Sequence, residues 1–430
     1  MRIGFLLHNA YAIGGTTRTT FNLAGSLADR HDVRIVSVFR HRARPLLTPP
    51  PGVPLTALVD RRGTAPDAAD PRAHEPGRFF PAGESRAPQY HRLAEERVID
   101  WLKATGTGTG TDTATEADAV ISTRTGLNVL LARFGPPGTL RIGQEHLTHD
   151  AHPHRLRREL QRWYPRLDAL VTMTRADARA HRTGLALPHG LVTAIPNCVP
   201  QTEAPPADLT REVVVAAGRL TPVKRYHLLV AAFDRAARDR PGWRLRIYGA
   251  GVERDRIAAE IDRRGLRDRV RLMGAVTPLD PEWAKGSIAA VTSAQESFGM
   301  TIVEAMRCGL PVVATDCPHG PREIIRDGVD GRLIPRDDLR AYSAALAELM
   351  DDPALRRRMG AAAREHAAKA FAPEQVTGRY EELLSAPPEH PDTVPPAPRR
   401  VLALYRATVR LLAAGALRRT RRTLRRAVMS

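Results

Sequence analysis

The stretch that decides the fold is ESFGMTIVE, residues 296–304, in which seven residues separate two glutamates behind the apolar run IAAVTSA. We expect that run to be a strand, Glu296 to lie on the loop after it, and a helix to begin near Phe298 or Gly299. The first N–H groups of a helix have no partner inside it, so they point at whatever lies beside the loop. Glu304 would lie about one and a half turns into the helix. Glu296, the free N–H groups and Glu304 would then line one trough in the order acceptor, donor, acceptor. Sugar hydroxyls, a phosphate and ribose hydroxyls need partners in that order. An ordinary helix cap followed by a solvated helix face explains the same residues.

Two further segments favour an anion. Arg219 and Lys224 follow the apolar run VVVAA in GRLTPVK, so both would flank the start of the next helix, where a diphosphate is favoured. Only four of the 65 basic residues are lysines, so the presence of a lysine at this position favours a specific role for it. Near the N-terminus, Gly14 and Gly15 follow the strand-like RIGFLL and open a predicted helix. Paired glycines let backbone approach a phosphate closely, but a simple turn also explains them.

Taken together, these motifs resemble those of glycosyltransferase family 4, whose members are retaining, nucleotide-sugar-dependent enzymes of the GT-B architecture. The resemblance covers roughly residues 1–385. The matching segments are IPNCV, GRLTPVKRYHLLVAAF, YGAGVERDRI, RVRLMGAV and the Glu-x7-Glu stretch with MTIVEAMRCGLPVVAT. DCPHGPREIIRDGVDG, at 316–331, is similar more narrowly to members that glycosylate polyol-phosphate or cell-envelope polymers.

Strand-like and helix-like runs alternate along the chain, which predicts an α/β fold with parallel sheets and crossover helices. The predicted strands are 2–7, 33–39, 119–124, 139–144 and 169–174, then 213–218, 243–249, 269–274, 288–294, 311–316 and 331–335; the predicted helices follow Gly15, Thr125, His154 and Arg175 and begin near Asp337, Pro353 and Pro373. The resemblance implies a GT-B architecture: two doubly wound Rossmann-like domains facing each other across a cleft, plus a basic helical C-terminal tail.

The domain boundaries follow from composition and from the resemblance. Residues 1–200 would form the N-terminal acceptor domain, completed by a crossing helix at about 373–386, and 205–372 the nucleotide-sugar domain. A Pro-rich tether at 387–398 and a basic amphipathic tail at 399–430 would follow. Two insertions, 61–88 and the low-complexity 104–117, are too polar to bury much apolar surface and are expected to be mobile loops.

The resemblance also assigns roles to residues. Glu296 would hold hydroxyls of the donor sugar and Glu304 the ribose, while Arg219 and Lys224 would neutralise the β-phosphate. His146, in IGQEHLTHDAH at another strand end, would lie near the transferred sugar as a further catalytic residue. The residues expected to bind the donor are Gly14, Gly15, Arg219, Lys224, Glu296, Ser297, Phe298, Gly299, Met300 and Glu304.

No metal and no other cofactor is expected. The chain has no Asp-x-Asp, so a metal held in that way is not predicted. His149, His152 and His154 could suggest a metal site, but metal sites usually need firmer spacing and a second shell, and these histidines also suit an acceptor groove or solvent. Cys198, Cys308 and Cys317 offer no paired framework, so we expect reduced thiols in a cytoplasmic protein.

The composition is that of a globular protein with an unusual tail. A length of 430 residues, 43% hydrophobic and 5% aromatic, accommodates two soluble α/β domains. RIGFLL is too short for the apolar core of a signal peptide, and no apolar window is long enough for a spanning helix. Residues 399–426 contain ten Arg and no acidic residue, so this segment carries ten of the eighteen excess positive charges. Its apolar residues recur at helical spacing. This pattern favours binding to the anionic inner face of a membrane, whereas the alternatives are a solvated tail or nonspecific nucleic-acid binding.

The implied activity is the transfer, with retention, of a hexose or N-acetylhexosamine from a nucleotide-diphosphate sugar to a hydroxyl group. By resemblance alone UDP is favoured as the nucleotide, and the acceptor would be a cell-envelope polymer, a glycolipid or a related molecule. GDP-mannose-dependent mannosyl transfer is the nearest alternative. A nucleotide-sugar epimerase would need acid/base carboxylates in the first domain, which cannot be placed. A nucleic-acid-binding protein would explain the basic tail but not the cleft motifs.

Overall fold

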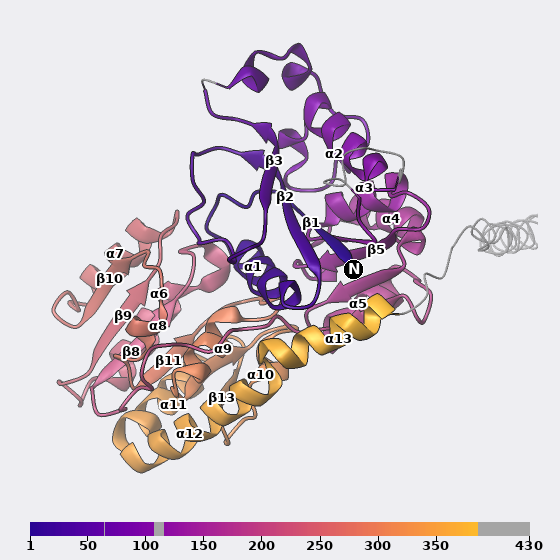
Figure 1. Cartoon of the computed structure of the whole chain (residues 1–430). Helices are drawn as coiled ribbons and strands as arrows, with labels where there is room; N and C mark the ends of the chain where they lie inside the picture. Colours follow the sequence, from indigo (N-terminus) through magenta and orange to yellow (C-terminus); the bar gives the residue numbers. More distant parts are fainter. Residues whose placement is uncertain (64, 107–115, 386–430) are drawn as a thin grey trace, which may run out of the picture. The chain divides into compact units, whose positions relative to one another are not determined.

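The first half of the chain forms a seven-stranded parallel sheet (Figure 1). The computed structural model of the protein describes residues 1–63, 65–106 and 116–385. The strands of this sheet, in the spatial order β3-β2-β1-β4-β5-β6-β7, are β1 (Arg2–Leu7), β2 (Asp32–Arg40), β3 (Leu55–Asp60), β4 (Ala119–Ser122), β5 (Leu140–Glu145), β6 (Ala169–Thr172) and β7 (Val192–Ala194). Its helices are α1 (Gly15–Ala28), α2 (Arg92–Ala104), α3 (Thr125–Phe134), α4 (His154–Trp163) and α5 (Arg175–Gly184), with short 3-10 turns η4 (His149–Ala151) and η5 (Tyr164–Arg166).

The second half forms a six-stranded parallel sheet in the order β10-β9-β8-β11-β12-β13. Its strands are β8 (Val213–Ala217), β9 (Arg244–Tyr248), β10 (Val270–Gly274), β11 (Ile288–Val291), β12 (Val312–Asp316) and β13 (Gly331–Pro335). The helices are the 3-10 turn η6 (Pro222–Lys224), α6 (Tyr226–Ala236), α7 (Arg254–Arg263), α8 (Asp280–Trp283), α9 (Met300–Arg307), α10 (Pro321–Ile324), α11 (Leu339–Asp351), α12 (Pro353–Ala370) and α13 (Pro373–Ser385).

Both sheets are doubly wound, as predicted. In each, the strand order reverses beside the first strand, between β1 and β4 and between β8 and β11. Ligands of such sheets bind outside the carboxyl ends of the strands at this reversal. Gly14 follows β1, Arg219 follows β8 and Glu296 follows β11, so three of the predicted segments leave strands next to a reversal.

The strands form where the sequence is continuously apolar. All five residues of β8 (VVVAA) are buried, as expected for a parallel strand covered by helices on both faces. All the predicted strands are present, whereas β3 and β7 were not predicted. Each lies at an edge of the first sheet, and only one residue of β3 is buried, so its pattern lacks the apolar signal of the central strands.

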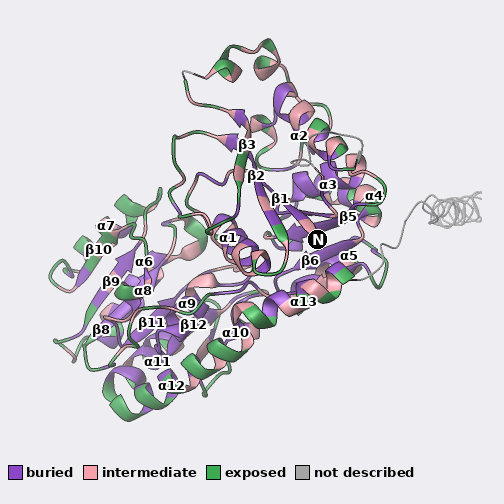
Figure 2. Ribbon diagram, in the orientation of Figure 1, coloured by how far each residue is buried: buried purple, intermediate pink, exposed green. Residues whose placement is uncertain are grey.

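The core runs through both sheets (Figure 2). One cluster of buried apolar side chains joins residues of the first sheet, such as Phe5, to residues of the second, such as Val215. The helix α13 at the end of the described chain adds Tyr380 to the same cluster, and the Tyr380 hydroxyl accepts a hydrogen bond from Gln144 Nε2 at 2.7 Å. The described helix nearest the C-terminus therefore completes the half formed by the first strands.

The insertion at 61–88 is more structured than expected. It contains two short 3-10 helices, η1 (Pro66–Ala69) and η2 (Pro71–His74), and η3 (Ala87–Gln89) closes it. The carboxylate of Glu95, buried on α2, accepts hydrogen bonds from three consecutive amides, those of Arg78, Phe79 and Phe80. The Phe80 ring also stacks on Tyr90 at 3.6 Å. Composition did not reveal this anchor, because its acceptor comes from the following helix.

Several expectations concern residues that are not described. The tether at 387–398, the tail at 399–430 and most of the low-complexity insertion, 107–115, lie outside the described residues. The three cysteines are free and buried. Among the helices that the structure describes, none combines the length and the apolar character needed to cross a bilayer.

Candidate active site

Glu296 and the start of α9 have the predicted arrangement. Glu296 is half-buried on the loop after β11, and α9 begins at Met300 with Gly299 as its N-cap. Gly299 has φ 118°, and a Cβ at that position would lie 2.9 Å from Ile302 Cδ1, so only glycine suits this turn. Within the described chain, the amides of Phe298, Gly299 and Met300 donate to no acceptor. The Phe298 ring is buried edge-to-face on Phe371, so Phe298 can offer a ligand only its backbone.

Lys224 and Glu296 form an ion pair. Lys224 Nζ lies 2.5 Å from Glu296 Oε1, and Ser293 Oγ donates to the same oxygen at 2.6 Å. Both charged side chains are largely shielded, with exposed fractions of 17% and 11%. Arg219 is exposed, and its side chain makes no hydrogen bond or ion pair with any described residue. The predicted anion-binding cation and the predicted sugar-binding carboxylate thus lie in direct contact, and an entering ligand would have to exchange partners with them.

Glu304 is buried on α9 and contacts the first half of the chain. Arg18 Nη1, on α1, donates to Glu304 Oε1 at 2.8 Å. Burial raises the pKa of Glu304, and the Arg18 guanidinium opposes that rise. Sequence reasoning missed Arg18, although it follows the Gly14–Gly15 pair by three residues and therefore lies in the first turn of the same helix. This ion pair brings the start of α1 to the helix that carries Glu304.

The Gly14–Gly15 turn leaves open space beside the start of α1. Gly14 is the N-cap of α1 in an extended conformation, and Gly15 is the first residue of the helix. A Cβ on Gly15 would meet no atom within 4 Å, so nothing in the described structure requires a glycine there. The amides of Gly15, Thr16 and Thr17 have no acceptor in the described part of the chain. Free amides and an empty approach at a helix start suit an anion.

His146 lies on the loop after β5. Its Nε2 is 3.2 Å from Gln144 Oε1, and burial lowers the pKa of His146 to about 4. The same loop reaches the second half of the chain, because Gln295 Nε2 donates to Thr148 Oγ1. Gln295 directly precedes Glu296, so the loop that carries His146 and the loop that carries Glu296 touch.

A further contact joins the two halves nearby. Glu323 on α10 accepts hydrogen bonds from the amides of Arg175 and Ala176, at 2.9 and 2.7 Å, and so caps the start of α5. His319 Nε2 lies 3.5 Å from Asp150 Oδ2. Both residues of the second half belong to the segment DCPHGPREIIRDGVDG, so part of this motif holds the halves together.

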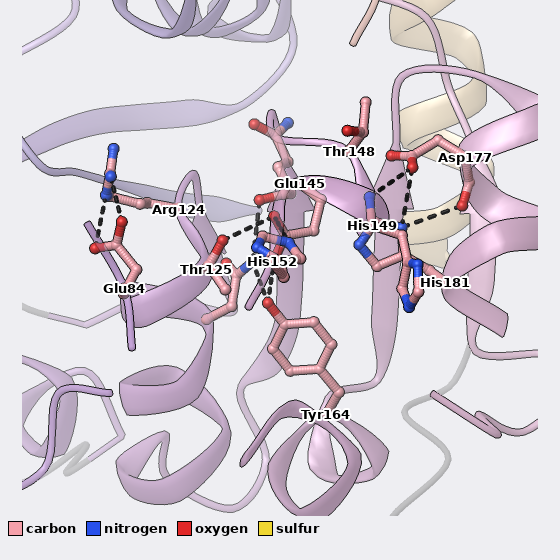
Figure 3. A network of polar contacts seen from close by, with 12 residues as sticks. Glu84, Arg124, Thr125, Glu145, Thr148, His149, His152, Tyr164, Asp177 and His181 are labelled. Atoms are coloured by element: carbon pink, nitrogen blue, oxygen red, sulfur yellow. Dashed lines mark hydrogen bonds and ion pairs between the residues drawn. The ribbon is translucent and has the colours of Figure 1, made fainter. Parts of the chain in front are cut away.

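His149, His152 and His154, which follow His146 in the sequence, do not form one cluster. His154 is exposed at the start of α4, and His149 lies beside Asp150. Instead, His152 lies with Glu145 and His181, and one ligand atom from each falls within 4.8 Å of the others (Figure 3). Glu145 and His181 were not predicted, since His181 is on α5 and only the fold brings it to the end of β5.

A pocket of the described structure lies elsewhere. It has a volume of about 400 Å³, is formed where α12 meets α13, and is lined in part by Pro196, Lys369, Glu374, Arg379 and Glu382. None of the predicted site residues lines it. The candidate site is therefore defined by converging side chains and free amides.

Sequence comparisons connect this chain to known glycosyltransferases. Residues 201–366 match the family model of the glycosyl transferases group 1. An exopolysaccharide phosphotransferase of Streptomyces coelicolor is 33% identical over 401 residues, 90% of this chain and 41% of that protein. A poly(ribitol-phosphate) α-N-acetylglucosaminyltransferase of Staphylococcus aureus is 27% identical over 195 residues, 45% of this chain and 40% of that protein. This chain thus spans less than half of either relative.

Solved structures share the fold over nearly the whole described chain. Staphylococcus aureus TarM, in complex with fondaparinux, α-GlcNAc-glycerol and UDP, has a TM-score of 0.73 at 15% identity, covering 90% of this chain and 100% of that one. Anabaena HepE with UDP and glucose has a TM-score of 0.68 at 20% identity, covering 90% of this chain and 99% of that one. The predicted GT-B fold is confirmed.

Proposed function

We propose that the chain is a retaining glycosyltransferase of family 4 that transfers a hexose or N-acetylhexosamine from a nucleotide-diphosphate sugar to a hydroxyl of a cell-envelope polymer, glycolipid or related acceptor. The observation that carries the proposal is the Lys224–Glu296 pair beside the free amides of Phe298, Gly299 and Met300. This constellation lies inside the segment that matches the glycosyl transferases group 1. UDP is the proposed nucleotide, because both structural relatives named above were solved with UDP.

The proposed chemistry breaks the bond between the anomeric carbon and the diphosphate. The nucleoside diphosphate leaves with the bonding electrons, the acceptor oxygen forms the new bond to the anomeric carbon, and the hydroxyl proton leaves that oxygen. Lys224, Arg219 and the free amides at the start of α9 would stabilise the charge that develops on the β-phosphate, in place of a metal. Glu296 would exchange Lys224 for hydroxyls of the sugar. His146 would lie against the transferred sugar, Glu304 would bind the ribose, and the Gly14–Gly15 turn would cover the diphosphate.

A second candidate is transfer of a sugar phosphate, because the Streptomyces coelicolor relative is a phosphotransferase. The two reactions break different bonds. Glycosyl transfer releases a nucleoside diphosphate, whereas phosphosugar transfer cleaves the diphosphate and releases a nucleoside monophosphate. The match covers only 41% of that relative, so the similarity does not assign the phosphotransfer to the matched part.

The nucleotide product separates these functions. The full chain is incubated with UDP-GlcNAc, UDP-glucose or GDP-mannose, with and without poly(ribitol phosphate), and the nucleotides and sugars are resolved by chromatography. We expect UDP together with a glycosylated polymer or slowly released free sugar. UMP with sugar phosphate would replace the proposal by phosphotransfer, and a 2-epimer of the sugar by epimerisation. Mass spectrometry of any nucleotide sugar that copurifies identifies the donor.

Replacing Gly15 with alanine is expected to raise the KM for the donor about tenfold, because the added methyl group would occupy the space through which the diphosphate approaches. The folded protein should not be destabilised, since a Cβ meets no atom there and alanine favours a helix by about 1 kcal/mol over glycine. Steady-state kinetics and thermal unfolding measure the two effects. Gly378→Ala is the matched control, because Gly378 is also helical with open space at its Cβ. An unchanged KM in Gly15→Ala would contradict diphosphate binding at this turn.

Residues 399–430 are proposed to bind anionic membrane lipid without taking part in the chemistry. This segment carries ten Arg and no acidic residue. Each Arg close to an anionic membrane surface contributes about 1 kcal/mol of binding free energy. A chain that ends at Ala386 should keep its activity on a soluble acceptor but should no longer sediment with phosphatidylglycerol vesicles. Binding by the full chain should weaken as salt rises, and neutral vesicles provide the control. Equal sedimentation of the shortened and full chains would refute this role.

A further inference from the structure

Two histidines and a glutamate meet in the interior at the end of β5. Glu145 ends this strand, His152 follows η4 and His181 lies on α5, and their exposed fractions are 1%, 3% and 0%. The Nε2 atoms of both histidines are buried and have no hydrogen-bond partner in the described structure. Figure 3 shows His152 and the Tyr164 hydroxyl beside Glu145. Two buried imidazole nitrogens without a hydrogen bond, next to a buried carboxylate, need an explanation.

The surroundings of His181 fix which nitrogen is free. His181 Nδ1 lies 3.1 Å from the backbone oxygen of Asp177 and 3.4 Å from its Oδ1, so this nitrogen carries the proton. The lone pair is then left on Nε2. Metal-binding histidines show the same arrangement, in which the second ring nitrogen donates to a carboxylate or carbonyl and orients the ring.

Three hydrogen bonds hold the Glu145 carboxylate in place. Thr125 Oγ1 donates to Oε2 at 2.9 Å, and Asn128 Nδ2 and the Tyr164 hydroxyl donate to Oε1. His152 Nε2 lies 3.5 Å from Oε2, which is long for a charge-assisted hydrogen bond of about 2.7–2.9 Å. It is close to the edge, about 3.4 Å, of a tetrahedral zinc shell with bonds of about 2.0–2.2 Å.

We propose that Glu145, His152 and His181 bind a divalent transition-metal ion, zinc by ligand type, which pins the loop that carries His146. Two imidazoles and one carboxylate suit zinc, whereas magnesium and calcium prefer oxygen ligands. Solvent would take the fourth place of the shell. The ion would join β5 and α5 to both ends of the loop 146–151, which carries His146 and Thr148. The three residues are none of those proposed to bind the diphosphate, so the ion would leave the proposed role of Lys224 unchanged, and the site does not depend on the proposed function.

Metal content tests the proposal directly. The untagged full chain, produced in zinc-supplemented medium and desalted without chelator, is analysed by inductively coupled plasma mass spectrometry. We expect about one zinc per chain, as three protein ligands require. Replacement of zinc by Co²⁺ should give the intense visible bands of a four-coordinate site. His152→Gln and His181→Gln should reduce the metal content at least tenfold. Asp177→Asn, which alters the carboxylate beside His181 Nδ1 that also accepts from the His149 amide, should weaken metal affinity about ten- to a hundredfold.

His154→Ala is the matched control, because His154 lies on the same stretch of chain but is exposed. It should keep the full metal content. The proposal is overturned if the folded wild-type chain holds less than a tenth of an equivalent of zinc and shows no Co²⁺ bands, or if His152→Gln and His181→Gln retain the metal. Circular dichroism monitors folding of each variant, and if a variant does not fold, the wild-type zinc content and Co²⁺ spectrum decide.

Discussion

Replacing Lys224 with alanine is expected to lower kcat/KM for the donor about ten- to a hundredfold. A charge-assisted hydrogen bond contributes about 1.5–3 kcal/mol, which corresponds to this range. In the structure Lys224 Nζ lies 2.5 Å from Glu296 Oε1, so the variant also leaves that half-buried carboxylate without its cation. Both the leaving diphosphate and the placement of Glu296 should therefore suffer. Steady-state kinetics with a saturating acceptor measure the loss.

One control and one parallel variant make this result specific. Lys369→Ala removes another lysine that pairs with a glutamate, Glu365, but on an exposed helix surface, and it should leave kcat/KM unchanged. Arg219→Ala should lower kcat/KM to a similar extent as Lys224→Ala, since Arg219 is exposed and its side chain makes no hydrogen bond or ion pair with a described residue that would be lost. Added Mg²⁺ or Mn²⁺ should not accelerate the wild type or rescue Lys224→Ala. A strict requirement for an added divalent ion would contradict the role of the two cations.

The two glutamates of the ESFGMTIVE stretch should affect different kinetic constants. Glu296→Ala is expected to lower kcat by about ten- to a hundredfold, because Glu296 would contact the sugar, whose shape changes during the reaction. Glu304→Ala is expected mainly to raise the dissociation constant of the donor, because ribose contacts change little between ground state and transition state. Calorimetric titration with UDP and rapid-quench kinetics separate binding from turnover.

The Arg18 contact sharpens the second comparison. Because Arg18 Nη1 donates to Glu304 Oε1, alanine at 304 would also leave a guanidinium unpaired. Glu304→Gln keeps the shape and an acceptor oxygen, so it separates lost charge from lost contact. Glu365→Ala, on the surface of α12, is the control and should change neither constant. If both variants at 296 and 304 kept wild-type kinetics, the assignment of this stretch to the donor would be wrong.

The sequence was sufficient to predict each half of the fold. Runs such as VVVAA predicted central strands because parallel strands covered on both faces are continuously apolar. The placement of Glu296 and α9 was also predictable, since the end of a strand and a helix start are local features. β3 and β7 were missed because edge strands bury fewer residues and carry a weaker pattern.

Contacts between the halves could not be predicted in this way. Arg18 with Glu304, Gln295 with Thr148, and Glu323 with the start of α5 each join residues more than a hundred positions apart. No local pattern identifies such partners, since they depend on how two separately formed sheets meet. Packing within the first half hid two further features. His181 reaches the end of β5 only through the placement of α5, and the 61–88 insertion is anchored by Glu95 from the following helix.

The return of α13 to the first sheet has a consequence for how the chain folds as it is synthesised. Tyr380 and its neighbours pack against Gln144 and α1, so the first half has an uncovered apolar face until the last described helix has emerged. At about 5–20 residues per second, the residues between β7 and α13 take on the order of ten seconds or more to be made. During that interval the nascent first half is a natural client for chaperones, and synthesis of the second half sets the time at which it can become native.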